Sequence, residues 1–297
     1  MKGILEDKTG LKSGQDFYLA FSPEREDPGN AQYTTTTIPK VVGGCDRDAG
    51  DLAECLYAEV IGKVVRVSSA AAAEATKITE NVFRAVNIAL VNELKIVYER
   101  MGIDVWEVLD AAATKPFGFM RFNPGPGWGG HCIPLDPFYL SWKAREHGID
   151  TKFIELAGEI NRSMPFYVAE RLQLALNDRG KAVKGSAVMI LGMAYKKDVG
   201  DTRESPAFPV AKKLLELGAK LTYHDPYVKE VPETRSWPGH PEMHSLPLTE
   251  ETLARHDAVV IVTDHSKVDY ALVAKHAKLI IDSRGVYREP RANVVKA

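Results

Sequence analysis

The chain has 297 residues, which is enough for two domains with hydrophobic cores of their own. Its 38 lysines and arginines nearly balance its 40 aspartates and glutamates, and a formal net charge of −2 argues against a nucleic-acid-binding surface or an electrostatic funnel for an acidic substrate. No signal peptide or membrane-spanning run is predicted, and three cysteines are too few for a disulfide framework, so the composition predicts a protein of the reducing cytoplasm.

Residues 1–67 are predicted to form an incomplete α/β unit. The pattern consists of an extended run, a polar loop, a short apolar run, a helix and a second extended run, at 17–21, 22–30, 40–44, about 47–60 and 63–67. No βαβ pattern comes before the first run, so a preceding part of the unit is expected.

The loop at 22–30 follows a predicted strand, and α/β sheets keep their chemistry at the ends of strands. Its acids, Glu24 and Glu26, are therefore candidate bases. Taken alone, a segment so rich in proline, glycine and aspartate is better interpreted as an ordinary solvent-exposed turn.

The longest predicted helix runs from 70 to 100, with Ser68 or Ser69 as its cap and Gly102 as its stop. Apolar residues recur along it at helical spacing: Ile78, Val82, Val86, Leu90, Leu94 and Val97. Its length of roughly 45 Å suits a spacer between domains or a dimer interface. Lys77 and Asn81 are four residues apart and share one face, which usually means only a solvated surface.

Three shorter helices are predicted after it, at 104–113, 137–147 and 152–177, the last with a break or restart at Pro165. The middle of the chain, 68–180, is therefore predicted to be all-helical.

A loop rich in glycine and proline lies within this helical part, at 125–137, and contains Cys132. Gly125, Gly127 and Gly130 match G-x-G-x-x-G as a string, but no strand precedes them, so we reject a dinucleotide fingerprint. We interpret the glycines as allowing the backbone to approach a substrate, and Cys132 as a nucleophile.

Other interpretations of this loop are weaker. A free cysteine is most often a small buried hydrophobe, but such a residue rarely needs six glycine and proline neighbours. Pro137 at a helix start places the segment from Cys132 to Asp136 near a helix N-terminus, which favours a thiolate. His131 and Cys132 are too few to hold zinc, so no metal site is predicted.

From residue 181 strands and helices alternate. Four strands are predicted, at 185–192, 221–225, 258–263 and 278–282, which with crossover helices form a doubly wound parallel sheet. Lys196, Lys197 and Arg203 follow the first strand, beside the start of a helix at Ser205-Pro206. These cations suit a diphosphate, although alone they also suit a charged loop.

Three separated stretches together resemble the UDP-glucose/GDP-mannose dehydrogenase family. Gly-Pro-Gly-Trp-Gly-Gly-His-Cys-Ile-Pro-Leu-Asp-Pro at 125–137 resembles its catalytic-cysteine loop, Lys-Lys-Asp-Val-Gly-Asp-Thr-Arg-Glu-Ser at 196–205 its binding signature, and Asp-Ser-Arg-Gly at 282–285 its terminal Asp-x-Arg. The His-Cys-Ile-Pro form looks most like bacterial UDP-N-acetylglucosamine 6-dehydrogenases, with UDP-glucose and UDP-N-acetylmannosamine as less favoured substrates.

The resemblance implies a division of the chain into three parts. Residues 1–67 would be the later part of an NAD-binding domain whose glycine fingerprint is not in this sequence, 68–180 a central helical and dimerisation domain, and 181–297 a UDP-sugar-binding domain. It also implies a homodimer through the central helices and a four-electron oxidation of a sugar C6 alcohol to a carboxylate by NAD. Many members carry Arg-Ile-Gly before the cysteine loop, where this chain has Arg121 as the candidate subunit-bridging arginine.

The resemblance further implies roles for individual residues. The catalytic ones would be Cys132 as nucleophile, Lys77 and Asn81 on the reacting sugar oxygen, Asp136 as base and Glu24, ahead of Glu26, activating the hydrolytic water. The predicted substrate-binding residues are Gly127, Gly129, Gly130, His131, Phe122, Lys196, Arg203 and Arg284. The predicted cofactor-binding residues are Glu24, Lys196 and Arg203.

Two other functions are open on the sequence alone. The lack of a glycine fingerprint favours a non-catalytic, truncated nucleotide-sugar-binding and dimerising module, which would take up UDP-sugar without NAD. A cysteine hydrolase would need a base histidine placed by the fold, and His131 beside Cys132 in sequence does not indicate one.

Overall fold

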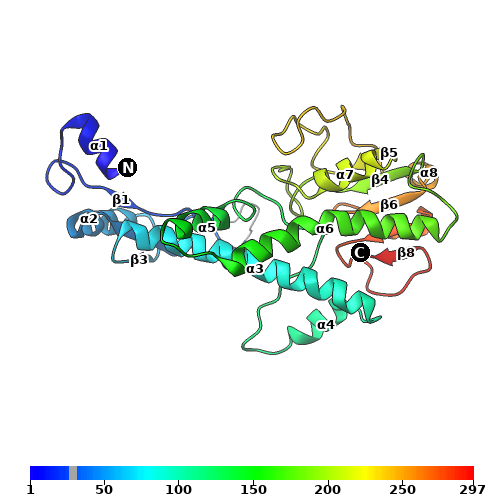
Figure 1. Ribbon diagram of the computed structural model, residues 1–297, viewed down its shortest axis with the longest axis horizontal. Coiled ribbons are helices and arrows are strands. Elements are labelled where there is room, and N and C mark those ends of the chain that lie inside the picture. Colours follow the sequence, from blue (N-terminus) through cyan, green and yellow to red (C-terminus); the bar gives the residue numbers. More distant parts are fainter. Residues whose placement is uncertain (27–31) are drawn as a thin grey trace. The chain divides into compact units, whose positions relative to one another are not determined.

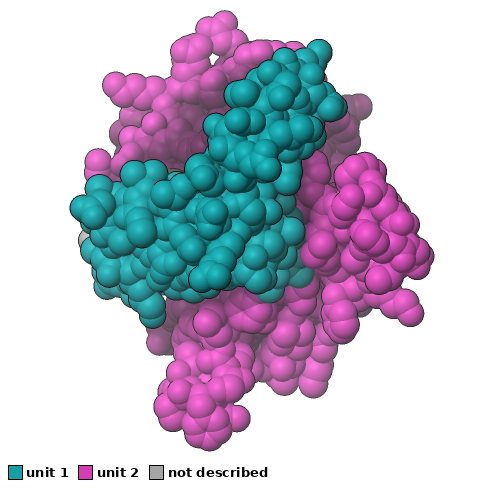
Figure 2. Space-filling view, turned by 90° about the vertical axis from the view of Figure 1, so that its left-hand side faces the viewer, with its two compact units in different colours: residues 1–82 teal, residues 83–297 magenta. Residues whose placement is uncertain are grey.

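The computed structural model describes residues 1–26 and 32–297, so the end of the polar loop predicted at 22–30 lies outside the described residues. The chain divides into two compact units, 1–82 and 83–297, and the boundary falls within the long helix α3 (Ala70–Arg100). Figure 1 labels the helices and strands, and Figure 2 colours the two units. Each unit is described by itself, and the three-part division of the chain stays a prediction.

The first unit is a small α/β unit with three strands in the order β1-β2-β3. Its elements before α3 are α1 (Lys2–Thr9), β1 (Ala20–Phe21), β2 (Lys40–Gly44), α2 (Arg47–Ala58) and β3 (Val64–Arg66). Strands β2 and β3 are parallel and β1 is antiparallel to β2. The strand predicted at 17–21 is only two residues long. The pattern does not predict α1, because no residue of that helix is buried and it has no apolar stripe.

Helix α3 has the predicted bounds. The Ser69 hydroxyl accepts a hydrogen bond from the Ala72 amide at 3.1 Å, and Gly102, with φ 73°, ends the helix in a left-handed conformation. The predicted apolar stripe is not its buried face, since Leu90 and Val97 are 49% and 45% exposed. Most of its buried positions instead form a neighbouring line of small and polar residues: Asn81, Ala85, Ala89, Asn92 and Lys95.

Three helices follow as predicted: α4 (Val105–Ala112), α5 (Asp136–Glu146) and α6 (Lys152–Asn177). The break predicted at Pro165 is wrong, because α6 continues through it. An interior proline removes one hydrogen bond and costs about 3 kcal/mol. Burial offsets this cost, since Met164, Val168 and Leu172 are fully buried around the proline.

The second unit contains a five-stranded parallel sheet in the order β5-β4-β6-β7-β8. Its elements are β4 (Ala187–Leu191), α7 (Ala207–Glu216), β5 (Lys220–His224), α8 (Glu250–Arg255), β6 (Ala258–Ile261), α9 (Tyr270–His276), β7 (Ile280–Asp282) and β8 (Val294–Lys296). The four predicted strands are confirmed. The edge strand β8 is not predicted, because three residues are too short to show a pattern.

Successive strand residues face opposite sides of this sheet. Val188 and Ile190 pack in one core with α6 and α7, whereas Met189 and Leu191 pack in another with α8 and α9. The chain moves from β4 to β5 on one side and to β6 on the other. The carboxyl ends of β4 and β6 therefore form the topological switch point, where such sheets bind ligands.

No helix within the described parts of the chain is long and apolar enough to cross a membrane.

Candidate functional site

A polar cleft of about 580 Å³ lies at this switch point. We call it the polar cleft and define it by its lining residues: Asp110, Arg121, Asn123, Pro124, Tyr195, Lys196, Lys197, Asp264, Arg284, Gly285, Val286 and Arg288. Two of the predicted ligand-binding residues, Lys196 and Arg284, thus meet here from motifs that are far apart in the sequence.

Five cationic side chains line the polar cleft against two carboxylates, so its walls carry an excess of positive charge. Asp110 pairs with Arg121 and, at 3.8 Å, with Arg288. Asp264 lies 3.7 Å from the Lys197 ammonium. The charge excess, at the carboxyl edge of a parallel sheet, suits a diphosphate.

Arg284 is held rigidly at the base of the cleft. Its Nε donates a 2.6 Å hydrogen bond to the Val262 carbonyl, and a Cβ at position 125 would lie 2.5 Å from its Nη1. A side chain at position 125 would therefore displace the guanidinium, which favours glycine there.

The loop after β4 carries the Lys-Lys-Asp signature and has a closed, strained backbone. The Tyr195 amide donates to the Asp201 carbonyl at 2.9 Å, which closes the loop. Asp198 and Glu204 have φ angles of 60° and 49°, a left-handed conformation that costs about 1 kcal/mol or more in a residue other than glycine. Such strain persists only where the surroundings hold the backbone, so we name residues 195–204 the signature loop and treat it as a fixed part of the site.

Arg203 does not line the polar cleft, so the cleft gives no support to its predicted role in ligand binding. Its Nε and Nη2 bind the Asp201 carboxylate at distances of 2.6 to 3.1 Å, and these hydrogen bonds raise the pKa of the arginine, with smaller contributions from Tyr195 and Cys132. The ligand-binding role of Arg203 stays a prediction.

The amides directly after β4 are occupied by the protein itself. In dinucleotide-binding sheets such amides take a phosphate. Here the buried Asp225 carboxylate accepts hydrogen bonds from the amides of Met193 and Ala194 at 2.7 and 3.1 Å. An internal anion therefore fills this position, and these two amides are not available to a phosphate.

The cysteine loop, residues 125–137, is fixed at Gly125 by two polar residues of α3. The Asn92 side chain accepts from the Gly125 amide at 2.9 Å and donates to Asn161 on α6 at 2.9 Å. The Lys95 ammonium donates to the Gly125 carbonyl at 3.2 Å and to the Ala297 carbonyl at 2.8 Å. Burial, with Arg284 nearby, lowers the pKa of Lys95 to about 7.

The remaining glycines of this loop lie against the protein's own groups. A Cβ at position 127 would lie 2.9 Å from the Asn161 carbonyl oxygen, and at 129 or 130 it would lie 2.8 to 2.9 Å from Tyr195. The Gly130 amide also donates to the Arg203 carbonyl at 3.1 Å. These contacts dock the cysteine loop on the signature loop. The predicted contacts of Gly127, Gly129 and Gly130 with substrate stay predictions.

Cys132 is partly exposed, so its thiol is not sealed in the core. Its carbonyl accepts from the amides of Leu135 and Asp136, and this turn leads into α5, whose first residue is Asp136. The predicted position near a helix N-terminus is confirmed. His131 is exposed, whereas the Phe122 ring packs edge-on against Phe83 at 5.7 Å, away from the lining of the polar cleft.

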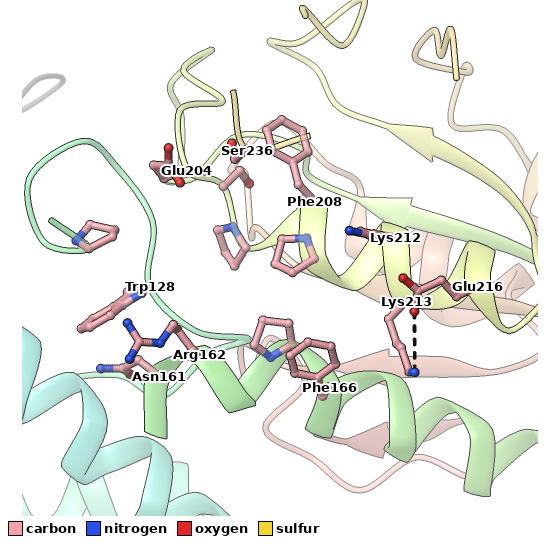
Figure 3. Close-up of a pocket in the computed structure, with 15 residues that line it drawn as sticks. Trp128, Asn161, Arg162, Phe166, Glu204, Phe208, Lys212, Lys213, Glu216 and Ser236 are labelled. Atoms are coloured by element: carbon pink, nitrogen blue, oxygen red, sulfur yellow. Dashed lines mark ion pairs between the residues drawn. The ribbon is translucent and has the colours of Figure 1, made fainter. Parts of the chain in front are cut away.

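An apolar groove of about 420 Å³ lies on the other side of the cysteine loop, between α6 and α7 (Figure 3). Trp128 and Arg162 are at one end of it, and the ion pair of Lys213 and Glu216, at 3.7 Å, is at the other. Seven of its fifteen lining residues are prolines or aromatic residues, and none of the predicted site residues lines it. The groove does not suit a phosphate.

The first unit holds three of the predicted catalytic residues. The Glu24 carboxylate pairs with Lys40 at 3.1 Å and accepts from the amides of Arg25 and Glu26. Burial acts to raise its pKa, but these hydrogen bonds outweigh it and lower the pKa. Arg25 then pairs with Glu80 at 2.6 Å, which ties this loop to the part of α3 that carries Lys77, half-buried, and Asn81, fully buried.

The described residues do not form a cradle for the diphosphate of a dinucleotide. Strand β2 ends in Gly43 and Gly44, but the Asp46 carboxylate caps the next helix by accepting from the Ala49 amide, so an anion already occupies the N-terminus of α2. The turn after β4 is filled by Asp225 in the same way. Within the same described parts, no group of three histidine, cysteine or acidic residues is arranged to hold a metal ion.

Several residues of the site are not predicted from the sequence. Asn92, Lys95 and Asn161 anchor the cysteine loop, and polar residues inside an otherwise helical apolar pattern are the signal that could have found them. Asp225 follows a predicted strand, which is a visible signal, but its partners are remote in sequence.

Comparison with known proteins shows which family the chain resembles. Residues 71–163 match the central domain of the UDP-glucose/GDP-mannose dehydrogenase family, and residues 189–289 match its UDP binding domain. The chain is 34% identical to UDP-N-acetyl-D-mannosamine dehydrogenase of Pyrococcus horikoshii, over 98% of this chain and 66% of that protein. It is 36% identical to UDP-N-acetyl-D-glucosamine 6-dehydrogenase of Salmonella typhi, over 89% and 60%.

The solved structure of UDP-D-ManNAc dehydrogenase from Pyrococcus horikoshii has a TM-score of 0.87 and 32% identity, covering 99% of this chain and 68% of that one. The chain thus spans 60 to 68% of the length of these relatives. These matches confirm what the three motifs predicted: the chain belongs to the UDP-glucose/GDP-mannose dehydrogenase family.

Proposed function

We propose that this chain binds a UDP-sugar in the polar cleft and supplies the thiol that oxidation of the sugar C6 alcohol to a carboxylate requires. The observation that carries the proposal is the meeting of Lys196 and Arg284 in a cleft whose signature loop docks on the loop of Cys132. The names of the relatives make an N-acetylated sugar the expected substrate class, and the His-Cys-Ile-Pro form favours UDP-N-acetylglucosamine over UDP-N-acetylmannosamine.

Family membership implies a nicotinamide dinucleotide as the electron acceptor, and we propose that it is NAD. Because the described residues offer no cradle for its diphosphate, the roles given below are those of this chain's own side chains.

A nucleophile is needed because an aldehyde has no second hydride to give until something adds to its carbon. Cys132 would add to the C6 aldehyde to form a thiohemiacetal, whose oxidation gives a thioester that water cleaves to the carboxylate. From their family motifs, Lys77 and Asn81 would stabilise each oxyanion, by about 3 kcal/mol per donor. Asp136 would accept the proton of the alcohol, and Glu24, kept ionised by its lowered pKa, would activate the water.

Calorimetric titration with UDP tests the binding proposal. The wild-type chain is expected to bind UDP, and Lys196→Met to bind it about tenfold more weakly, since a hydrogen bond to a charged group is lost. Lys212→Met, in the apolar groove, is the matched control and should bind like wild type. A wild-type chain without affinity for UDP would contradict the proposal.

The thiol step has its own test. In an NAD-complete protein that contains this chain, incubation with NAD and UDP-N-acetylglucosamine is expected to give the uronic acid and NADH, and Cys132→Ser to give no uronic acid. Cys55→Ser is the control, because that exposed cysteine lies on α2 and has no proposed role. Undiminished product from Cys132→Ser would rule the scheme out, and repeating the assay with UDP-N-acetylmannosamine ranks the two sugars.

A second candidate function is a nucleotide-sugar-binding module without oxidation. The observation that favours it is that Asp46 and Asp225 occupy the two turns where a dinucleotide could have bound. Such a module would bind UDP in calorimetry, show no affinity for NAD and give no NADH absorbance.

We also propose that two copies associate through the central helices. Large apolar side chains on α5 and α6 are well exposed: Tyr139 by 65%, Trp142 by 61%, Phe153 by 77% and Leu156 by 53%. Light scattering of the eluted protein should give the dimer mass, and Trp142→Glu with Phe153→Glu should give the monomer mass.

A further inference from the structure

A fully buried histidine, His265, lies behind the signature loop and is not part of any motif considered so far. Its Nδ1 accepts a 2.9 Å hydrogen bond from the Asp198 amide, and its Nε2 lies 3.1 Å from the Asp225 carboxylate. An amide N–H can only donate, so Nδ1 must carry the lone pair and the proton must be on Nε2. The imidazole is therefore neutral, in the form that donates to Asp225.

Asp225 is itself a fixed point in the fold. Besides His265 and the amides of Met193 and Ala194, its carboxylate accepts from the amides of Tyr227 and Val228 at 2.8 and 3.0 Å. The carboxylate cannot move without breaking several buried hydrogen bonds. His265 thus connects an immobile anion to the middle of the signature loop.

His265 accepts its hydrogen bond from Asp198, a residue whose backbone is in a strained, left-handed conformation. Asp198 has a φ angle of 60°, and its carboxylate accepts a 2.7 Å hydrogen bond from the Ser266 amide. Residues 265 and 266, after β6, therefore fix both the backbone and the side chain of Asp198. Lys196 and Lys197, which line the polar cleft, come immediately before this point in the chain. The direction of the chain at Asp198 decides where these lysines lie.

An aromatic ring lies against the buried imidazole, and a lysine ammonium lies over that ring. The Tyr227 ring lies 5.1 Å from the imidazole, centre to centre, and the Lys267 ammonium lies 4.8 Å from the Tyr227 ring. A buried hydrogen bond without competing water is worth more than an exposed one, and losing one partner leaves the other unsatisfied.

We propose that His265 is a positioning residue for nucleotide binding: its Nδ1 lone pair holds the Asp198 amide and so keeps Lys196 in the wall of the polar cleft. The proposal rests on the binding of UDP proposed above. His265 touches neither ligand nor reacting atoms, and it acts through the backbone of the signature loop.

Two substitutions separate the two halves of the imidazole. In His265→Asn the amide oxygen can take the place of Nδ1 and accept from Asp198, whereas in His265→Gln the amide nitrogen can take the place of Nε2 and donate to Asp225. We expect His265→Gln to bind UDP about tenfold more weakly than wild type, and His265→Asn to bind within about threefold of it. Equal losses in the two variants, or the greater loss in His265→Asn, would overturn the proposal.

Two readouts do not depend on UDP. Hydrogen exchange at the Asp198 amide should be fast in His265→Gln and slow in wild type and in His265→Asn, and urea unfolding of both variants shows that each is folded. In the wild type, the ¹⁵N shifts of His265 should show an unprotonated Nδ1 and a protonated Nε2. A protected Asp198 amide in His265→Gln, or a proton on Nδ1 in the wild type, would overturn the proposal whether or not UDP binds. Lack of UDP binding by the wild type would contradict the proposed function instead.

Discussion

Two buried carboxylates end two strands of the same sheet, and each braces one of the cation-bearing loops of the polar cleft. Asp225 follows β5 and fixes the signature loop that carries Lys196, whereas Asp282 ends β7 and accepts a 3.1 Å hydrogen bond from the amide of Arg284. Both are almost fully buried, yet their pKa values shift in opposite directions.

The difference comes from the donors around each carboxylate. Burial acts to raise the pKa of Asp225, but hydrogen bonds from His265 and from backbone amides outweigh it and lower the pKa. Burial also raises the pKa of Asp282, and the amides of Tyr287, Val286 and Arg284 offset it only in part. The comparison teaches that the carboxylate of Asp225 is a stable anion built into the fold, whereas the charge of Asp282 is costly to keep.

The strongest test of this difference between Asp225 and Asp282 is to neutralise each acid in turn. Asp225→Asn places an amide group against several N–H donors and removes a buried charge from its partners, so we expect a loss of about 3–5 kcal/mol in the free energy of unfolding. Asp282→Asn should lose only about 1 kcal/mol, because the cost of the buried charge disappears with the charge. Urea unfolding at pH 7 measures both, and equal losses would show that the donor sets do not decide the difference.

The sequence predicts the polar cleft better than the groups that brace it. The Lys-Lys-Asp and Asp-x-Arg motifs follow predicted parallel strands, and the switch-point rule then brings Lys196 and Arg284 together without coordinates. Asp225 is as visible as Asp282, since both end predicted strands. Which groups a carboxylate faces, however, depends on residues that only the folded chain brings close, and for Asp225 these are Met193, 32 residues before it, and His265, 40 residues after it.

The cysteine loop shows the same limit. Its glycines and Cys132 stand out in the sequence, but the reason for Gly125 is the guanidinium of Arg284, and its anchor is Lys95, on a helix predicted from its apolar stripe. A hydrophobic pattern is enough to identify a helix. The same pattern predicts that every polar residue of the helix faces solvent, which is wrong for a polar residue on its buried face. The helix break predicted at Pro165 is wrong for a related reason, because the burial that keeps α6 continuous is a property of the tertiary structure.

Lys95 is a buried cation, in contrast to the two buried carboxylates. The contribution of Lys95 to the free energy of unfolding should depend strongly on pH. Its pKa is about 7 in the folded protein and near 10.5 in the unfolded chain, so unfolding takes up a proton between these values. The free energy of unfolding should therefore rise with pH from 7 upwards, by up to about 2 kcal/mol at pH 9. In Lys95→Met this rise should be absent.

Urea unfolding of the wild type and Lys95→Met at pH 7, 8 and 9 measures this difference, with Lys212→Met as the control for general effects of losing a lysine. Parallel pH profiles for the wild type and Lys95→Met would mean that the ammonium keeps an ordinary pKa in spite of its burial.

The opposite pKa shifts of the two acids also predict opposite pH dependences below neutrality. The stabilisation from Asp225 is present above the unfolded carboxylate value, near pH 3.9, and is lost as pH falls through its lower folded value. For Asp282 the sign is reversed: the folded state holds the proton more tightly, so its contribution falls as pH rises from about 3.9 through the folded value. Between pH 3 and 5, the loss caused by Asp225→Asn should therefore grow and that caused by Asp282→Asn should shrink. Urea unfolding at half-unit intervals of pH follows both, and two curves of the same slope would contradict the assignment.

The smallest expected effect comes from a variant that distinguishes two interactions of Asp198: the hydrogen bond of its amide to His265 and the hydrogen bond of its carboxylate to Tyr227. The Tyr227 hydroxyl donates to its carboxylate at 3.4 Å, a long hydrogen bond at the exposed edge of the signature loop. Tyr227→Phe removes that bond and leaves the ring over His265, so we expect a loss of no more than about 0.5 kcal/mol in stability and UDP affinity within about twofold of wild type. If the amide contact with His265 orders the loop, this variant should keep slow hydrogen exchange at Asp198. Fast exchange in Tyr227→Phe would instead mean that the hydrogen bond from Tyr227 to the Asp198 side chain orders the loop. The buried hydrogen bonds that link Asp225, His265 and the Asp198 amide would then be of secondary importance.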